Sequence, residues 1–335
     1  MAGVSRQTVS RVINGSPNVK PAVKKRIEAA IEELGYVPNL AARRMAGAKS
    51  FVILAINDRQ RTIENWQAGL GNDWVDQMLF GGMTASEKRG YHLLFELVDT
   101  NPDLAPRQLE GALSALRPDG VILTPPHSEN PILVSLIEAR GIACACIGID
   151  AEFQGVTVRM DEQAAAADAT RLLIEQGHRH IAFIAGSSAY SSSDSRVRGY
   201  QAALREAGIA TCEDYTEHGE FRFDLAEAAM ERLLDLAKPP TAVIASNDEM
   251  AFAVMHVASK RGLAVPDDLS VISFEDTPGV RFSVPPLTAI RQPTAMIIGK
   301  ATDLLIDRVA GKVVDGIYTI PHELVVRGTT GPART

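Results

Sequence analysis

The stretch Ala2-Gly-Val-Ser-Arg-Gln-Thr-Val-Ser-Arg-Val-Ile-Asn-Gly15 is the most informative part of this 335-residue chain. Ser5 can cap a helix, and the apolar Val9, Val12 and Ile13 would face inward from that helix. The outward face carries five polar side chains: Arg6, Gln7, Ser10, Arg11 and Asn14. Arg can donate two hydrogen bonds to guanine and Gln can bond adenine bidentately, so this face has the chemistry that base readout needs.

A second helix is predicted after the Asn-Gly-Ser-Pro turn at residues 14–17. Pro21 suits a helix start because the N–H that it lacks would have no partner there. Apolar residues then recur on one face, and Gly35 closes the helix. These apolar residues are Val23, Ile27, Ala30, Ile31 and Leu34. Two short helices in series predict a small all-α helix-turn-helix segment over residues 1–38.

Charge is distributed unevenly along the chain. Residues 1–50 contain nine Lys or Arg against three Glu, a net charge of +6, which leaves −13 for the rest of a chain whose total is −7. A basic head on an acidic body suggests that only the head meets a polyanion. Charge alone is equally compatible with a solvated helix surface, so that alternative stays open at this point.

The quoted stretch, followed by Tyr36-Val-Pro-Asn39 and by Gly47, resembles the LacI/GalR family of bacterial transcription regulators. The resemblance implies that Arg6, Gln7 and Arg11 read the major groove of DNA. It also implies that six residues contact or approach phosphates, namely Ser5, Thr8, Ser10, Asn14, Tyr36 and Asn39. Operator DNA is therefore the expected macromolecular partner, and a homodimer is the expected assembly.

The resemblance further implies a hinge over residues 39–50, whose helix would enter the minor groove and wedge an apolar side chain between base pairs. Met45 occupies the wedge position, where relatives usually carry Leu, and Ala42 lies on the same hinge. Family members normally carry a first helix before Ala-Gly-Val-Ser, whereas here Met1 directly precedes Ala2. We expect a helix-turn-helix without that helix to bind its operator weakly, and a start upstream of Met1 would account for the difference.

From Phe51 onward, apolar strands alternate with amphipathic helices, which is typical of parallel α/β sheets with helices on both faces. We predict strands at 51–57, 91–98, 120–124, 142–148, 180–185, 242–246 and 270–274. We predict helices near 74–89, 105–116, 130–140, 161–177, 195–208, 223–237, 248–262 and 293–310. The body is longer than one usual core, so two subdomains are expected.

Motifs in the body extend the resemblance, among them Gly177-His-Arg-His-Ile-Ala-Phe-Ile-Ala-Gly186 and Ala245-Ser-Asn-Asp-Glu-Met-Ala251. The resemblance implies that residues 51–335 form an effector-binding and dimerisation domain with the two-lobed fold of type I periplasmic binding proteins. Its N-lobe would comprise about 51–160 plus 293–321. Its C-lobe would comprise about 161–291 plus 322–335.

Open α/β sheets bind ligands at the carboxyl ends of their strands. That rule and the matching family positions give six candidate effector-binding residues: Trp74, Thr124, Arg196, Phe221, Asn247 and Glu275. Arg196 and Asn247 can bond pairs of sugar oxygens, and Phe221 matches a family aromatic that stacks on the ligand. A sugar or small glycoside is the predicted effector. Glu275 stands where relatives usually carry Asp, which implies a shifted or smaller ligand, or a different contact.

Each of these candidates also has a structural alternative. Asn247 could merely cap the helix that follows it, Phe221 could be core, and Arg196 could serve a structural ion pair. Trp74 could be a core or dimer residue. Residues 58–73 do not match the usual short pocket loop of the family, and we predict a loop over the cleft. The Ser-rich segment 187–195 is predicted to be a mobile loop at the cleft mouth.

Composition and motifs exclude several classes. No apolar run approaches the roughly 20 residues of a membrane helix, and the N-terminus has no apolar signal segment, so we predict a cytoplasmic protein without a membrane partner. The three cysteines fit a reducing compartment. No phosphate-cradling motif occurs, so we expect neither an enzyme nor a cofactor, and no metal site. The leading hypothesis is a ligand-responsive repressor, and the alternative is an exported periplasmic-type sugar-binding protein without DNA binding.

Overall fold

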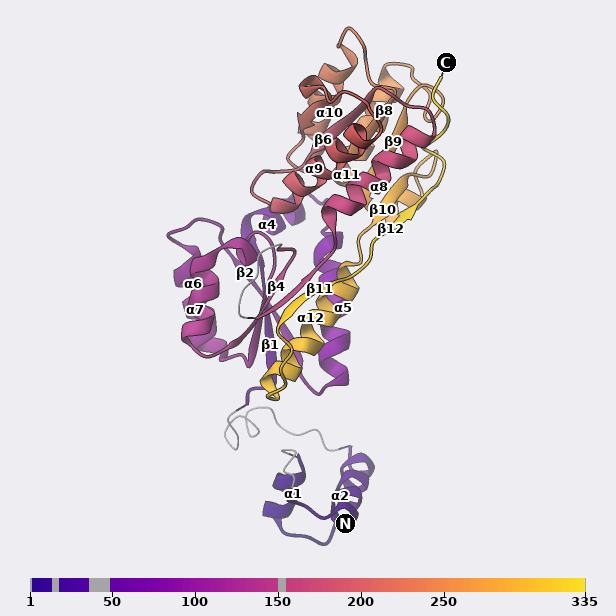
Figure 1. Cartoon of the computed structure of the whole chain (residues 1–335). Coiled ribbons are helices and arrows are strands. Elements are labelled where there is room, and N and C mark those ends of the chain that lie inside the picture. The colour runs from indigo at the N-terminus through magenta and orange to yellow at the C-terminus, as the bar shows by residue number, and fades with distance from the viewer. Residues whose placement is uncertain (1, 14–17, 36–48, 150–154, 335) are drawn as a thin grey trace.

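The computed structural model describes residues 2–13, 18–35, 49–149 and 155–334 of the chain. Its body contains two six-stranded sheets, and a short helical head precedes them (Figure 1). The predicted fold class, two α/β lobes after an all-α segment, is confirmed. Within the described residues, no helix combines the length and the apolar character required to cross a membrane.

The described part of the head consists of α1 (Arg6–Ile13) and α2 (Pro21–Glu33). The Ser5 hydroxyl accepts a hydrogen bond of 3.1 Å from the backbone N–H of Thr8, so Ser5 caps α1 as predicted. Val12 and Ile27 are buried between the two helices' inner faces. Leu34, which the periodicity placed on the inner face, is the residue that follows α2 and is 53% exposed, so that part of the prediction was wrong.

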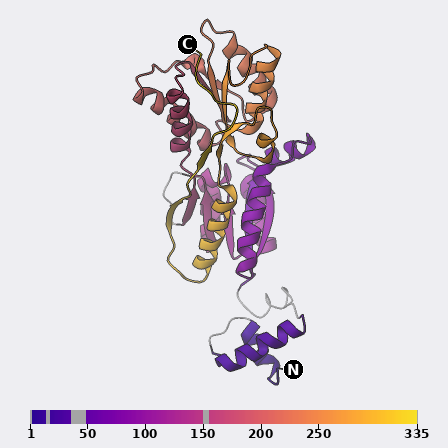
Figure 2. The same cartoon turned by 90° about the vertical axis from the view of Figure 1, so that its right-hand side faces the viewer.

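The N-lobe sheet is entirely parallel, in the order β11-β5-β4-β3-β1-β2. Its strands are β1 (Val52–Asp58), β2 (His92–Val98), β3 (Gly120–Leu123), β4 (Ala143–Ile147), β5 (Val156–Arg159) and β11 (Gly316–Thr319). Helices α5 (Asp73–Lys88) and α12 (Thr294–Val309) pack side by side on one face, as Figure 2 also shows. Helices α6 (Ala105–Leu116) and α7 (Pro131–Ala139) cover the other face. Cover on both faces explains why β1 is apolar over most of its length.

The C-lobe sheet has the order β12-β10-β9-β8-β6-β7, with only the β10–β12 pair antiparallel among the described pairings. Its strands are β6 (Ile181–Ala185), β7 (Thr216–His218), β8 (Ala242–Ala245), β9 (Ser270–Glu275), β10 (Thr288–Arg291) and β12 (Glu323–Val325). Helices α8 (Glu162–Glu175) and α9 (Ser191–Glu206) cover one face. Helices α10 (Phe223–Leu234) and α11 (Asp248–Lys260) cover the other.

The chain passes between the two sheets at three places. It leaves the N-lobe sheet after β5, returns between β10 and α12, and leaves again between β11 and β12. The carboxyl ends of the parallel strands therefore face each other across the junction of the lobes (Figure 1). This arrangement brings loops that are far apart in the sequence to one place.

Two segment predictions were wrong. Residues 59–67 are not a loop but helix α4 (Arg59–Gln67), which the Asp58 carboxylate caps by accepting from the backbone N–H of Arg61 at 3.1 Å. The Ser-rich segment 187–195 is a loop only in its first part, because Ser191 begins α9. In both cases a polar composition concealed a helix whose first turn lies at the lobe junction.

Candidate functional site

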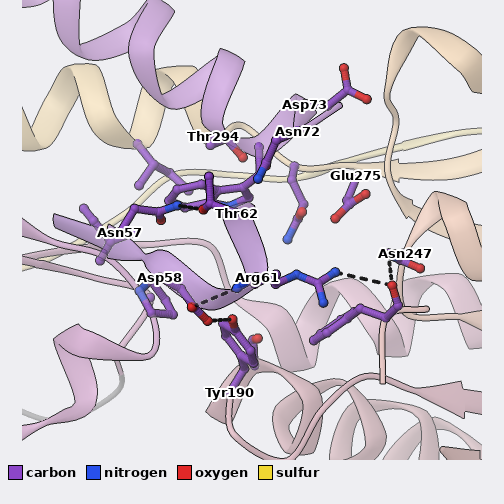
Figure 3. A pocket seen from close by; sticks show the side chains of 18 of the residues that line it. Asn57, Asp58, Arg61, Thr62, Asn72, Asp73, Tyr190, Asn247, Glu275 and Thr294 are labelled. Carbon is purple, nitrogen blue, oxygen red and sulfur yellow. Dashed lines mark hydrogen bonds between the residues drawn. The ribbon is translucent and has the colours of Figure 1, made fainter. Parts of the chain in front are cut away.

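A cavity of about 210 Å³ lies between the lobes, at the carboxyl ends of strands from both sheets. Its N-lobe wall comes from the end of β1, from α4 and from the start of α5, and its C-lobe wall comes from loops after β8 and β9 and from α9. Figure 3 shows side chains from the two walls pointing toward one another. Five of the six predicted effector-binding residues line it, namely Trp74, Arg196, Phe221, Asn247 and Glu275.

Thr124 is not among the residues that line this cavity, so the expected direct contact is corrected. The Thr124 hydroxyl is fully buried and donates at 2.8 Å to the backbone oxygen of Ile56, with the Asn57 Oδ1 at the same distance. The Asn57 amide in turn donates to the Thr62 hydroxyl at 2.9 Å. Thr124 directly follows β3 and bonds Asn57, which does line the cavity, so it orients Asn57 rather than facing a ligand.

Arg196 is held rigidly at the C-lobe wall. Its Nε donates to the Glu162 carboxylate at 2.8 Å, and its Nη1 donates to the backbone oxygen of Ser246 at 2.6 Å. The guanidinium carbon lies 4.3 Å from the centre of the Phe274 ring, and only 4% of the residue is exposed. The structural ion pair is therefore present, yet no described residue bonds the second terminal nitrogen, so the fork retains donors for a ligand.

Asn247 serves the fold and the cavity at once. Its Oδ1 accepts from the backbone N–H of Met250 at 2.9 Å, which caps α11, and its amide donates to the backbone oxygen of Phe221 at 3.3 Å. The capping alternative is thus realised in the structure. Because the side chain still lines the cavity, a ligand that bonds it would compete for these same groups.

Phe221 lies in a strained backbone conformation with a φ of 58° and is 9% exposed. Its ring packs where any side chain on Gly186 would collide with it, since a Cβ there would lie 2.0 Å from the ring. The Tyr190 ring meets it edge-on at 5.7 Å, and the guanidinium carbon of Arg61 lies 5.0 Å from its centre. Phe221 is therefore part core and part cavity wall, with one face already covered by a cation.

Glu275 ends β9 with a φ of 99°, a conformation that L-residues rarely adopt. Burial, together with the nearby Asp248 carboxylate, raises the pKa of Glu275 to about 8, although Arg196 and Arg61 oppose the shift. Burial also raises the pKa of Asp248 to about 6, against hydrogen bonds from Ser273 and Thr277. At neutral pH the Glu275 carboxyl is therefore largely protonated, and it can donate as well as accept.

Trp74 stands in the first turn of α5, after Asn72, whose side chain caps that helix by accepting from Val75 at 3.2 Å. The Trp74 ring lines the cavity and also packs against the N-lobe core. The core alternative for Trp74 is therefore realised together with the cavity position. The helix that carries Trp74 runs away from the site along the outer side of the sheet (Figure 2).

Several residues that line the cavity were not predicted as effector-binding, among them Asp58, Arg61 and Tyr190. Asp58 had a usable signal, because it follows a predicted strand at its carboxyl end. Arg61 and Tyr190 lie in the two segments that were predicted to be loops at the cleft, so their place near the site was expected, but no local pattern singled out either side chain. The Tyr190 hydroxyl donates to the Asp58 carboxylate at 2.7 Å, which joins the two walls directly (Figure 3).

The predicted DNA-reading face is partly described. Arg6, Gln7, Ser10 and Arg11 are exposed on α1, while Thr8 is half-buried and Ser5 is exposed at the helix cap. The remaining predicted DNA contacts lie outside the described residues: Asn14, Tyr36, Asn39, Ala42 and Met45.

Comparisons with known proteins match both parts of the chain. The model described as bacterial regulatory proteins, lacI family, matches residues 1–39, and a periplasmic binding protein-like domain matches residues 170–330. The chain is 34% identical to the HTH-type transcriptional regulator CelR of Thermobifida fusca, over 98% of this chain and 95% of that protein.

Two solved structures are similar over nearly the whole length. One is a transcriptional regulator CelR–cellobiose complex, with 31% identity and a TM-score of 0.76, covering 98% of this chain and 97% of that one. The other is the lac repressor dimer bound to operator and the anti-inducer ONPF, with 25% identity and a TM-score of 0.79, covering 98% and 96%. Head and body are thus matched together, in the same order.

Proposed function

The chain belongs to the lacI family of bacterial regulatory proteins, and on that basis we propose that it is a ligand-responsive transcriptional repressor. The head binds operator DNA, and the cavity between the lobes binds a small effector that alters this affinity. The two sites are thermodynamically linked, so effector and operator change each other's affinity by the same factor. The observation that carries the proposal is the cavity, walled by both lobes in a chain that also has a basic head.

A carbohydrate is the effector class that the cavity chemistry favours. The wall mixes amide, carboxyl and guanidinium groups from Asn247, Glu275 and Arg196 with the rings of Trp74 and Phe221. A neutral polyol both donates and accepts hydrogen bonds, so it satisfies such a mixed set better than an ion of one sign. The ligand in the similar CelR structure, cellobiose, is of this class.

We infer a homodimer from exposed apolar side chains on the helices beside the cavity. Phe80 and Met83 on α5 are 65% and 56% exposed, and Met296 on α12 is 63% exposed. Large apolar groups exposed together mark association surfaces. Trp74 on α5 lines the cavity, so a ligand that shifts this helix also shifts the surface on which the protomers would meet.

Two measurements test the proposal. Thermal shift with D-glucose, D-ribose, cellobiose, adenosine and an amino acid mixture identifies the ligand class. DNA selected from a random library by the immobilised protein is then titrated with and without the stabilising compound. Stabilisation by a sugar together with altered DNA affinity supports the proposal. Stabilisation by adenosine or amino acids alone overturns the carbohydrate class, and sugar binding with no selectable DNA favours a sugar-binding protein without DNA binding.

A further inference from the structure

Helix α4 reaches from the N-lobe to the C-lobe. Asp58, the last residue of β1, uses one carboxylate oxygen to cap α4 and the other to accept from the Tyr190 hydroxyl of the C-lobe at 2.7 Å. Within the first turn of α4, the Arg61 Nη2 donates to the backbone oxygen of Phe221 at 3.3 Å. Figure 3 shows Arg61 extended from the Asp58 side of the cavity toward Asn247.

A further direct contact closes the same side of the cleft. Glu129, in the short N-lobe helix His127–Glu129, accepts from the Ser191 hydroxyl at 2.8 Å and from its backbone N–H at 3.2 Å. Asp58, Arg61 and Glu129 therefore each bond a C-lobe group. All of these groups belong to the protein itself, so the lobes are connected without any ligand.

We propose that Arg61 is an intramolecular occupant of the cleft and a specificity-determining residue for the effector. It covers the face of Phe221, holds the lobes together before effector binds, and must be displaced by any ligand that stacks on that ring. The proposal rests on the proposed function for its ligand, but the connection between the lobes requires no ligand.

The size of the cavity predicts which size of ligand Arg61 would favour. With Arg61 in place, the space of about 210 Å³ is smaller than the roughly 300 Å³ at which pockets begin to enclose drug-sized ligands. Arg61 and Trp74 both line this space, and we expect it to admit a single sugar ring. A two-ring glycoside needs the Phe221 face as well. Arg61 therefore discriminates against the larger ligand.

The connection is tested without ligand by double electron–electron resonance on the full chain. Spin labels are attached to Arg107→Cys on α6 and Ala228→Cys on α10, both of which are exposed positions. The exposed native cysteine is removed by Cys212→Ser, whereas Cys144 and Cys146 are kept because they are buried. Labelled protein is diluted with unlabelled protein to remove distances between protomers. We expect Arg61→Ala to lengthen and broaden the distance distribution, and Arg59→Ala, an exposed arginine of the same helix, to leave it unchanged.

Tyr190→Phe is a second variant, which removes one hydroxyl and keeps the ring. It carries the test if circular dichroism shows that Arg61→Ala unfolds at a lower temperature than the parent. It should broaden the distribution in the same direction. A distribution for both variants that matches the parent overturns the proposal, because the lobes are then held by other contacts.

The role of Arg61 in ligand specificity is tested by isothermal titration calorimetry with D-glucose and cellobiose. If the form in which Arg61 occupies the cleft makes up about nine-tenths of the population, Arg61→Ala raises the affinity for cellobiose about tenfold, while the affinity for glucose changes less. Loss of both sugars in Arg61→Ala overturns displacement and makes Arg61 a direct ligand contact. If neither sugar binds the parent or the variant, the carbohydrate effector fails, and the distance measurement alone decides the connection.

Discussion

Gly81 packs directly against the backbone of Ala295 where α5 crosses α12. A Cβ on Gly81 would lie 2.1 Å from the Ala295 oxygen and 2.8 Å from its Cα, so the collision is with backbone that cannot turn away. Helix α5, which carries the exposed Phe80, and helix α12, which follows the crossover after β10, are therefore in direct backbone contact at this point. A shift of either helix at this crossing must be shared by the other.

Gly81→Ala should lower the free energy of unfolding by about 1–3 kcal/mol, because the added methyl overpacks a closed helix crossing. Urea denaturation followed by circular dichroism measures the change. The matched control is Gly111→Ala on α6, where a Cβ meets nothing within 4 Å. That substitution should raise stability by up to about 1 kcal/mol, since alanine is the better helix former. Equal effects at the two positions would contradict the crossing argument.

Arg196→Lys should weaken effector binding about tenfold or more while the protein remains folded. Lysine keeps the charge beside Glu162 but has no planar fork to bond the Ser246 oxygen and a ligand together. Isothermal titration with the sugar found in the thermal-shift screen measures the loss. Arg198→Lys, one exposed residue on the same helix, is the control and should bind like the parent. An unchanged affinity in Arg196→Lys would remove Arg196 from the site.

Glu275 predicts a specific pH dependence of stability. Its pKa rises from an ordinary 4.5 to about 8 in the folded protein, so the folded state binds more protons than the unfolded state between these values. Stability from this group is fully present below pH 4.5 and is lost as the pH rises to about 8, with a slope approaching ~1.4 kcal/mol per pH unit.

Glu275→Gln removes the titrating group, so the variant should gain stability relative to the parent as the pH rises through this window. Urea denaturation at about pH 5, 6, 7 and 8 measures the difference in the free energy of unfolding between this variant and the parent. Glu87→Gln, exposed on α5, controls for the loss of a negative charge. A difference between Glu275→Gln and the parent that stays constant with pH would show that the carboxyl titrates outside this range.

Arg11→Ala should weaken binding to the selected DNA by about 1–3 kcal/mol and relax the preference at one base position, the cost expected for loss of a bidentate base contact. The sugar response of the body should be unchanged. Fluorescence anisotropy with single-base variants of the DNA measures both affinity and preference. Arg26→Ala, exposed on α2, removes the same charge away from the reading face. A uniform loss across all base variants would place Arg11 on phosphate instead.

The sequence predicted the sheets well where strands are apolar over four or more residues. Strands β1, β3 and β8 are buried on both faces, and their continuous apolar runs are readable. The strands that were not predicted are short and carry mixed composition, such as β7 with Thr216 and Glu217. These strands form because a neighbouring strand pairs with them, and not because of an alternating or apolar pattern of their own. Local periodicity therefore could not reveal them.

The candidate site was predicted mainly in its C-lobe wall, whereas Trp74 was the one residue predicted correctly in its N-lobe wall and α4 was missed. Arg196, Asn247 and Glu275 follow strands or match family motifs. Helix α4 has no continuous apolar stripe, and only Thr62 is fully buried in it, so the helix is supported by the Asp58 cap and by tertiary contacts with β1 and β2. Contacts between lobes are tertiary, and no local pattern in residues 58–73 encodes them.

Helix α4 also has a consequence for how such regulators diversify. Its first turn is capped by Asp58 and the next helix by Asn72, so the intervening residues form a self-contained piece between β1 and α5. Loss of that piece would leave α5 with its own cap, because Asn72 accepts from Val75. If Arg61 acts as proposed, an insertion or deletion confined to this piece would change how the resting lobes are connected and would leave the cap of α5 in place.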